Sequence, residues 1–180
     1  MNSTATPPLV SIVVRTMGKP AFQRALASIA AQTHRPLEIV VVDATGGGLA
    51  LAKHADIPVR TVSKVKLARP HAANAGMGAS RGAWILFLDE DDEIEPGHVA
   101  QLLATAAAAS LPVAYNGGPF DRAALKRSSY LAIHSVIFHR SIIDAGLRFD
   151  ESLASLEDWN FWLKLAERSD FASTGQAPAK

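Results

Sequence analysis

The sequence predicts an α/β protein with a mostly parallel β-sheet flanked by helices and a small antiparallel addition in its C-terminal half. Short runs rich in Val, Ile and Leu alternate with stretches of helical spacing, which is typical of parallel strands joined by crossover helices. Carboxylates follow two of the apolar runs directly, at Asp43 and from Asp89 onward. A weakly alternating segment, residues 133–140, is expected to join the sheet as an antiparallel strand.

The first half of the chain is expected to contain the repeated strand–helix units. Buried strands are predicted at residues 9–15, 37–42, 59–62, 84–88 and 112–115. These runs are short, apolar and rich in β-branched side chains, as buried parallel strands are. Helices are predicted at residues 19–32, shortly after the glycines 46–48, at 71–80 and at 95–109.

The second half is less regular. Residues 116–119 (Asn-Gly-Gly-Pro) predict a loop, and a short helix is expected at 141–145. A last helix is expected from Ser155, which with Asp158 resembles a capping box. Glu157 and Asp158 then stand in its first turn, where the helix dipole favours carboxylates. This pair fits an ordinary amphipathic helix as well as a functional position.

Length and composition fit one domain over residues 1–180, with a frayed tail at 171–180. A hydrophobic content of 48% is enough for a core, and a net charge of +1 gives no basic field for nucleic acid. Cysteine is absent, residues 1–8 lack a signal-peptide pattern, and no apolar stretch approaches a membrane span. We therefore expect a soluble, cytoplasmic protein, with peripheral association at the inner membrane face as an open alternative.

Five carboxylates stand together after the apolar run Trp84–Leu88: Asp89, Glu90, Asp91, Asp92 and Glu93. Close like charges cost stability, and a hard cation such as magnesium, calcium or manganese removes that cost. In open α/β sheets ligands bind outside the carboxyl ends of the strands, so the cluster is well placed for a metal with a phosphate-bearing ligand. Taken alone, such a cluster is more often a solvated turn. The rest of the chain favours the site.

Six segments occur in an order that resembles family-two glycosyltransferases, which have the Rossmann-like GT-A fold. They are VSIVVRT (10–16), LEIVVVD (37–43), NAG (74–76), GAWILFLDEDD (82–92), FDE (149–151) and EDW (157–159). The resemblance extends from about residue 8 to about residue 168. It implies a nucleotide-sugar-binding half at about 8–115 and an acceptor and catalytic-base half at about 116–170.

The resemblance also implies roles for single residues. Contacts to the nucleotide sugar are implied for Thr16, Asp43, Asn74, Asp89 and Asp91. A divalent metal, Mn²⁺ or Mg²⁺, is implied at Asp91 and Asp92, and Asp158 is implied as the general base with Glu157 beside it. Family members invert the anomeric centre by direct displacement of the nucleoside diphosphate. The residue types agree, because a metal stabilises a leaving diphosphate and a carboxylate can remove the proton of an acceptor hydroxyl.

The chain departs from the family pattern in places. Arg15-Thr-Met-Gly18 stands where Pro-Thr-Tyr-Asn is usual, and only one acid, Asp43, ends the second strand where two are usual. Ala73 replaces a common arginine, for which Arg69 or His71 could substitute unless both are ordinary surface residues. The sequence also ends soon after the Glu-Asp-Trp segment, where family members continue.

Three functions stay open at this level. The first is an inverting, metal-dependent glycosyltransferase with a UDP-sugar as the expected donor and a lipid carrier, polysaccharide, protein or small molecule as acceptor. The second is a non-catalytic nucleotide-sugar-binding module or a fragment of a larger glycosyltransferase. The third is a sugar nucleotidyltransferase, which fold similarity alone does not exclude. The Glu-Asp-Trp segment favours the first over the third. We expect no nucleic-acid partner, and a homodimer is open.

Overall fold

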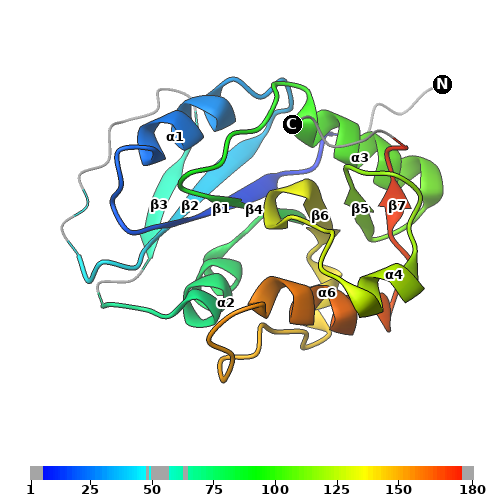
Figure 1. Cartoon of the computed structure of the whole chain (residues 1–180). Helices are drawn as coiled ribbons and strands as arrows, with labels where there is room; N and C mark the ends of the chain where they lie inside the picture. The colour runs from blue at the N-terminus through cyan, green and yellow to red at the C-terminus, as the bar shows by residue number, and fades with distance from the viewer. Residues whose placement is uncertain (1–5, 48, 50–56, 63–64, 176–180) are drawn as a thin grey trace.

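Strands from both halves of the chain form a single sheet of seven strands in the order β3-β2-β1-β4-β6-β5-β7 (Figure 1). The computed structural model describes residues 6–47, 49, 57–62 and 65–175. The parallel strands are β1 (Val10–Thr16), β2 (Leu37–Asp43), β3 (Val59–Val62) and β4 (Trp84–Asp89). The remaining strands are β5 (Val113–Tyr115), β6 (Val136–His139) and β7 (Ala172–Ser173). Strand β6 is antiparallel to both of its neighbours, which confirms the mostly parallel sheet with an antiparallel addition.

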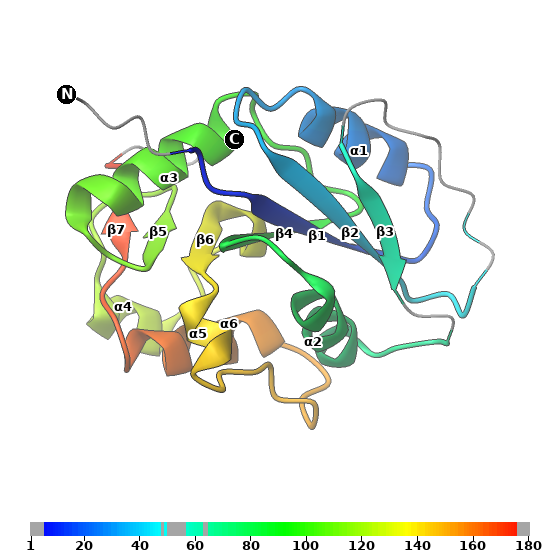
Figure 2. The same ribbon diagram turned by 180° about the vertical axis from the view of Figure 1, so that it is seen from behind.

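Helices cover both faces of this sheet (Figures 1 and 2). One face carries α1 (Phe22–Ala30) and α3 (His98–Ala109). The other carries α2 (Arg69–Ala79), α4 (Arg122–Arg127), α5 (Ser141–Asp144) and α6 (Glu157–Ala166). A short 3₁₀ turn, η1 (Ile133–Ser135), leads into β6. None of the helices within the described ranges has both the length and the apolar character that crossing a bilayer would require.

The two-residue period of the strands sorts their side chains between two separate cores. In β1, Ile12 and Val14 belong to the core under α1 and α3, whereas Val13 belongs to the core under α2 and α6. In β4, Leu88 packs on the α1 side and Phe87 on the α6 side. This alternation continues past the last apolar residue of each strand, so it decides which way the polar residues there point.

Several predicted boundaries need correction. Helix α6 begins at Glu157 after Leu156, which has a φ of 58° and no side-chain cap, so the capping box at Ser155 is wrong. Helix α4 was not predicted, although Asp121 caps it by accepting hydrogen bonds from two backbone amides. Residues 171–180 were expected to be a frayed tail, but strand β7 forms within them because it pairs with β5. The helix predicted after the glycines 46–48 lies outside the described residues.

Helix α2 comes very close to the sheet at Gly76. A Cβ at this position would lie 2.3 Å from Val13 Cγ1 and 3.0 Å from Val42 Cγ2, whereas a Cβ at Gly78 would have nothing within 4 Å. We expect Gly76→Ala to lower the free energy of unfolding by about 1–3 kcal/mol through overpacking. Gly78→Ala, the matched control, should leave it unchanged or raise it by up to about 1 kcal/mol. Urea denaturation measures both, and equal effects would contradict this close approach.

Candidate functional site

Polar side chains gather at the carboxyl ends of β1 and β4, and the strand alternation divides them into two pairs. Arg15 and Asp89 are partners in the β1–β4 register and both point to the α6 side. The next residues, Thr16 and Glu90, point to the α1 side and bond each other. The two pairs therefore connect this end of the sheet to different elements.

Arg15 joins the two acidic segments that the sequence singled out. Its Nε lies 2.9 Å from Asp89 Oδ1, its Nη2 lies 3.0 Å from Asp89 Oδ2, and its Nη1 lies 3.2 Å from Glu157 Oε1. The guanidinium also lies 5.9 Å from the centre of the Phe87 ring. Sequence reasoning treated Arg15 only as a departure from the family pattern. The sequence does contain a signal for its role, namely an arginine at the end of a buried strand. A charge buried there needs a partner of opposite charge.

Glu90 holds the loop between β1 and α1. One of its carboxylate oxygens accepts from Thr16 Oγ1 at 2.7 Å and from the backbone N–H groups of Met17 and Lys19 at 3.0 Å each. The Thr16 hydroxyl accepts in turn from Gly18 N at 2.9 Å. Glu90, the second acid of the cluster, is thus a buried structural group, while the loop it shapes borders the candidate site.

The remaining acids of the cluster have basic partners within the chain. Asp91 Oδ2 lies 3.2 Å from Lys19 Nζ, and Asp92 Oδ2 accepts from His134 Nδ1 at 2.9 Å. The Lys19 hydrogen bond and charge, with the charge of Arg69, hold the pKa of Asp91 below its usual value although burial opposes them. The repulsion inferred from the sequence is therefore relieved by the chain's own side chains. A cation is not needed for that purpose.

A small cavity of about 120 Å³ opens between these groups. Its lining residues are Arg15, Thr16, Met17, Lys19, Ala44, Leu67, Arg69, Ala72, Asp89, Glu90 and Asp91. No group of three or more metal-ligating side chains is present in the part of the chain that the structure describes. Asp91 nevertheless has a side chain that is 59% exposed, at the rim of this cavity. That arrangement fits a cation that brings phosphate oxygens and water and takes one or two carboxylates from the protein.

Asp43 and Arg69 differ in how they relate to this cavity. Asp43 is buried and does not line it; its Oδ1 accepts from Thr45 N at 2.9 Å and Thr45 Oγ1 at 2.6 Å. Burial raises the pKa of Asp43, but hydrogen bonds from Thr45 and Leu49 outweigh it and leave the pKa below its usual value. Arg69 lines the cavity, whereas His71 Nε2 lies 3.5 Å from Glu151 Oε2. Of the two candidates for the missing arginine, Arg69 is the one at the site.

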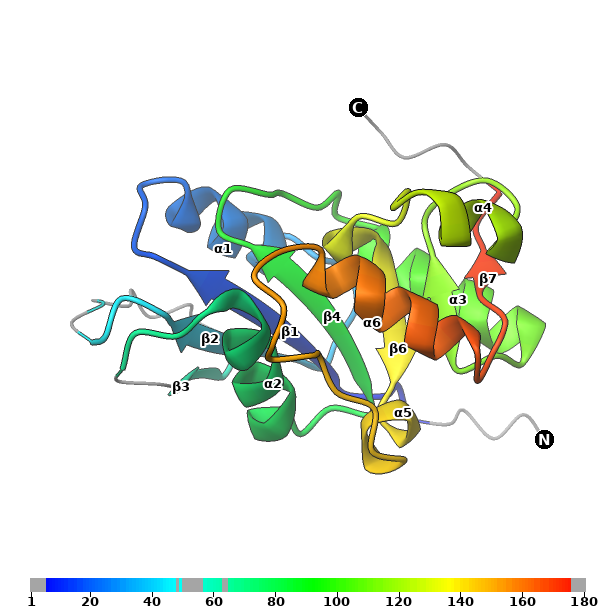
Figure 3. The same cartoon turned by 60° about the horizontal axis from the view of Figure 1, so that its bottom comes forward.

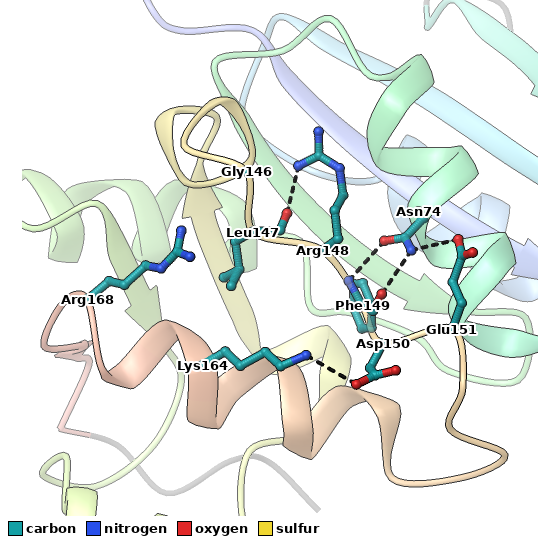
Figure 4. A pocket seen from close by; sticks show the side chains of 9 residues that line it. All are labelled: Asn74, Gly146, Leu147, Arg148, Phe149, Asp150, Glu151, Lys164 and Arg168. Carbon is teal, nitrogen blue, oxygen red and sulfur yellow. Dashed lines mark hydrogen bonds and ion pairs between the residues drawn. The ribbon is translucent and has the colours of Figure 1, made fainter.

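Asn74, implied by the resemblance as a donor contact, is engaged elsewhere. Its carboxamide accepts from Phe149 N at 2.9 Å and donates to Phe149 O at 3.0 Å and to Glu151 Oε1 at 2.9 Å (Figure 4). It borders a different, open cavity of about 700 Å³ that Arg148, Lys164 and Arg168 also line. Asn74 therefore pins the segment before α6 to helix α2, and we do not retain it as a donor contact.

The two acids at the start of α6 have different environments. Glu157 is 2% exposed and bonded to Arg15. Asp158 is half-buried, and its Oδ1 accepts from Trp159 N at 2.7 Å, while its Oδ2 has no hydrogen-bond donor among the described residues. Figure 3 shows the N-terminal end of α6 on the same side of the molecule as the carboxyl end of β4. Asp158 is therefore the more accessible carboxylate of this pair.

His134 and His98 are linked, and their pKa values shift in opposite directions. The hydrogen bond to Asp92 raises the pKa of His134, helped by the charges of Asp92 and Asp89 and opposed by burial. Burial lowers the pKa of His98, against its hydrogen bond from Nε2 to the His134 carbonyl at 2.9 Å. The contribution of His134 to stability is complete below its unfolded pKa near 6.5 and is lost as pH rises through its folded pKa. That of His98 is present above about pH 6.5 and is lost as pH falls through its folded pKa.

We therefore expect His134→Gln to lower the free energy of unfolding by about 0.5–1 kcal/mol at pH 5.5 and by less at pH 8.5. The effect is small because the ion pair between His134 and Asp92 is partly exposed. Denaturant unfolding at both pH values measures this difference. His139→Gln is the control, because the His139 ring bonds the Ser141 hydroxyl rather than a carboxylate. A cost for His134→Gln that does not change with pH would contradict a charged His134–Asp92 pair.

A sequence model of glycosyl transferase family 2 matches residues 11–141. The chain belongs to glycosyl transferase family 2. It is 30% identical over 187 residues to the succinoglycan biosynthesis protein ExoO of Rhizobium meliloti (strain 1021), covering 85% of this family 2 chain and 54% of ExoO. It is 33% identical over 97 residues to the uncharacterized glycosyltransferase YwdF of Bacillus subtilis (strain 168), covering 52% of this chain and 36% of YwdF. The chain thus spans about half or less of the length of these curated relatives.

Solved structures of other glycosyltransferases share the fold of this family 2 chain. S. aureus TarS 1-349 in complex with UDP-GlcNAc superposes with a TM-score of 0.71 at 17% identity, covering 93% of this chain and 56% of that one. The mannosyltransferase PcManGT from Pyrobaculum calidifontis in complex with GDP-Man and Mn²⁺ gives a TM-score of 0.72 at 16% identity, covering 97% and 56%. These likenesses confirm the GT-A fold implied by the sequence.

Proposed function

We propose that this chain carries the donor site and the general base of an inverting glycosyltransferase that moves a sugar from a nucleoside-diphosphate sugar to an acceptor hydroxyl. One observation carries the proposal: the Arg15 guanidinium connects Asp89, where β4 ends, to Glu157, directly before Asp158. A displacement needs groups for the leaving diphosphate and for the attacking hydroxyl near one reacting carbon. Both acidic segments meet at this end of the sheet.

The donor half of the proposal uses the cavity at the ends of β1 and β4. Thr16 and Asp89 line it, and Asp43 ends the neighbouring strand in register with Thr16. Lys19 and Arg69 are exposed cations that line the cavity, whereas Arg15 is buried and paired with Asp89 and Glu157. Lys19 and Arg69 are therefore the groups we assign to balance the charge of a diphosphate. A UDP-sugar is the donor we favour, because the TarS structure contains UDP-GlcNAc.

We assign the divalent-metal contact, for Mn²⁺ or Mg²⁺, to Asp91. The PcManGT structure contains Mn²⁺ with GDP-Man. When bound, such an ion supplies Lewis-acid stabilisation to the departing diphosphate. Asp92, implied as a second ligand, is bonded to His134 and does not line the cavity, so we assign it to supporting the loop after β4.

In the proposed transfer step, Asp158 is the acid of the chain that takes up the proton of the acceptor hydroxyl. The acceptor oxygen attacks the anomeric carbon from the face opposite the diphosphate, and its bond to carbon forms as the carbon–oxygen bond to the diphosphate breaks. The electron pair of that bond leaves with the diphosphate, and the hydroxyl proton passes to Oδ2 of Asp158, the oxygen that no described residue bonds. One displacement inverts the anomeric centre. The cytoplasm, which supplies nucleoside-diphosphate sugars, is the compartment we propose.

Calorimetric titration of UDP, GDP, CDP and dTDP, each with and without Mn²⁺, tests the donor half of the proposal. We expect UDP to bind and its affinity to depend on the metal. The matching nucleotide sugar is then assayed for release of the nucleoside diphosphate, with and without candidate lipid, polysaccharide, protein and small-molecule acceptors. Binding without any turnover would favour a nucleotide-sugar-binding module, and binding of no nucleotide would refute a donor site.

A further inference from the structure

We propose that Arg15 is the positioning residue that sets the place of the base helix α6 relative to the donor-side acid Asp89. This inference rests on the proposed roles of Asp89 and Asp158. It adds a role for a residue that the resemblance left without one, and it assigns the buried Glu157 a specific task as the anchor through which Arg15 acts.

Arg15 is itself held firmly. It lies opposite Asp89 in the β1–β4 register and binds both carboxylate oxygens of Asp89. Two parallel N–H···O bonds fix the plane of a guanidinium as well as its position. The side chain is 8% exposed and has the Phe87 ring beside it, so water does not compete strongly for its donors. Arg15 and Asp89 therefore move as one unit with the end of the sheet.

The third bond of Arg15 crosses from the sheet to α6. Glu157 is the first residue of that helix, and within the described ranges its only ion pair is with Arg15. Leu156, the N-cap residue of α6, makes no side-chain capping bond and has a left-handed backbone conformation. The chain direction at the helix start is thus fixed by an ion pair rather than by a cap. Asp158 is the next residue, so any movement of Glu157 is passed on to it.

This linkage should be visible in turnover more than in binding. A misplacement of about 1 Å between reacting groups can lower a rate by about 10²-fold. Nucleotide affinity should change little, because Thr16, Lys19, Arg69 and Asp91 remain in place. Lysine at position 15 keeps the positive charge. It cannot, however, form the two parallel bonds to Asp89 and the bond to Glu157 at the same time. A single charge-preserving change therefore separates positioning from electrostatics.

Arg15→Lys, Glu157→Gln and the double variant form the test, with Arg60→Lys as the matched control. Arg60 pairs with Glu38, which is also buried, at 3.2 Å near the opposite ends of the strands. We expect UDP affinity in the presence of Mn²⁺ to stay within about threefold, while kcat falls about 100-fold with little change in KM. Because both changes break one linkage, the double variant should be no more than about threefold slower than the slower single variant.

Hydrogen exchange supplies a readout that does not depend on activity. The amides of residues 160–163 should exchange about tenfold faster in Arg15→Lys and Glu157→Gln than in the wild type or Arg60→Lys. Unchanged exchange in both variants would overturn the linkage, as would loss of UDP binding in Arg15→Lys, which would make Arg15 a donor contact. A wild type that binds no nucleotide would refute the proposed function instead. The two failures are thus distinguishable.

Discussion

An Asp158→Asn variant is expected to transfer sugar about 10²–10⁴-fold more slowly than the wild type, the range typical of a lost general base. The amide keeps the size and the polarity of the side chain but cannot take the proton of the acceptor hydroxyl. UDP affinity should stay within about twofold, because the interaction removed acts in the transition state. Release of nucleoside diphosphate at saturating donor measures the rate, and calorimetry measures the affinity.

Glu167→Gln is the matched control for this experiment. Glu167 is an exposed acid at the other end of the same helix, at its C-terminal cap. Its substitution removes one negative charge from α6 without touching the site, and its turnover should equal that of the wild type. If Asp158→Asn kept full turnover, the base assignment would be wrong. If both variants slowed equally, the effect would lie in the charge of the helix and not in proton transfer.

Asp91→Ala should weaken Mn²⁺-dependent binding of UDP by at least about 100-fold, more than the 10–100-fold typical of losing an outer-shell partner of a metal. Asp91 is the acid of the cluster that is both exposed and at the rim of the cavity. Titration of Mn²⁺ followed by electron paramagnetic resonance, together with calorimetry of UDP, measures the loss. Removing the carboxylate also leaves Lys19 with Glu90 as its one remaining acidic partner among the described residues, so metal-independent binding of UDP should change less.

Glu93→Gln separates the metal contact from the general charge of the cluster. Glu93 pairs with Arg24 at 3.0 Å, is 56% exposed and does not line the cavity. This variant should bind Mn²⁺ and UDP as the wild type does. Equal losses in the two variants would mean that the cluster attracts cations only through its overall charge, and the assignment to Asp91 would fail.

Apolar runs were a good guide to the sheet, because buried parallel strands need apolar side chains on both faces. The strand predicted at 84–88 is β4 at Trp84–Asp89, and the one at 37–42 is β2 at Leu37–Asp43. The elements missed, α4 and β7, are short. Strand β7 forms because it pairs with the edge of β5. This is a tertiary contact, and the residues of β7 alone do not predict it.

The candidate site was harder to predict, because its geometry depends on the strand register and on long-range contacts. The sequence shows five adjacent acids, but only the alternation of β4 sends Asp89 toward α6 and Glu90 toward α1. The Arg15–Glu157 bond joins residues 142 positions apart. Asn74 was assigned by resemblance to the donor, whereas its carboxamide holds the segment before α6. Motifs locate such a site, and packing assigns the task of each side chain.

The hold of Glu90 on the β1–α1 loop bears on the engineering of chimaeric enzymes. The loop's shape depends on an acid more than 70 positions later in the sequence. That acid accepts hydrogen bonds from Thr16, Met17 and Lys19 together. Suppose that only residues 16–19 were replaced by those of another family member. The backbone of the new loop would then no longer match the position of the Glu90 carboxylate. Transplanting donor preference between such enzymes would therefore require moving two distant segments as a single module.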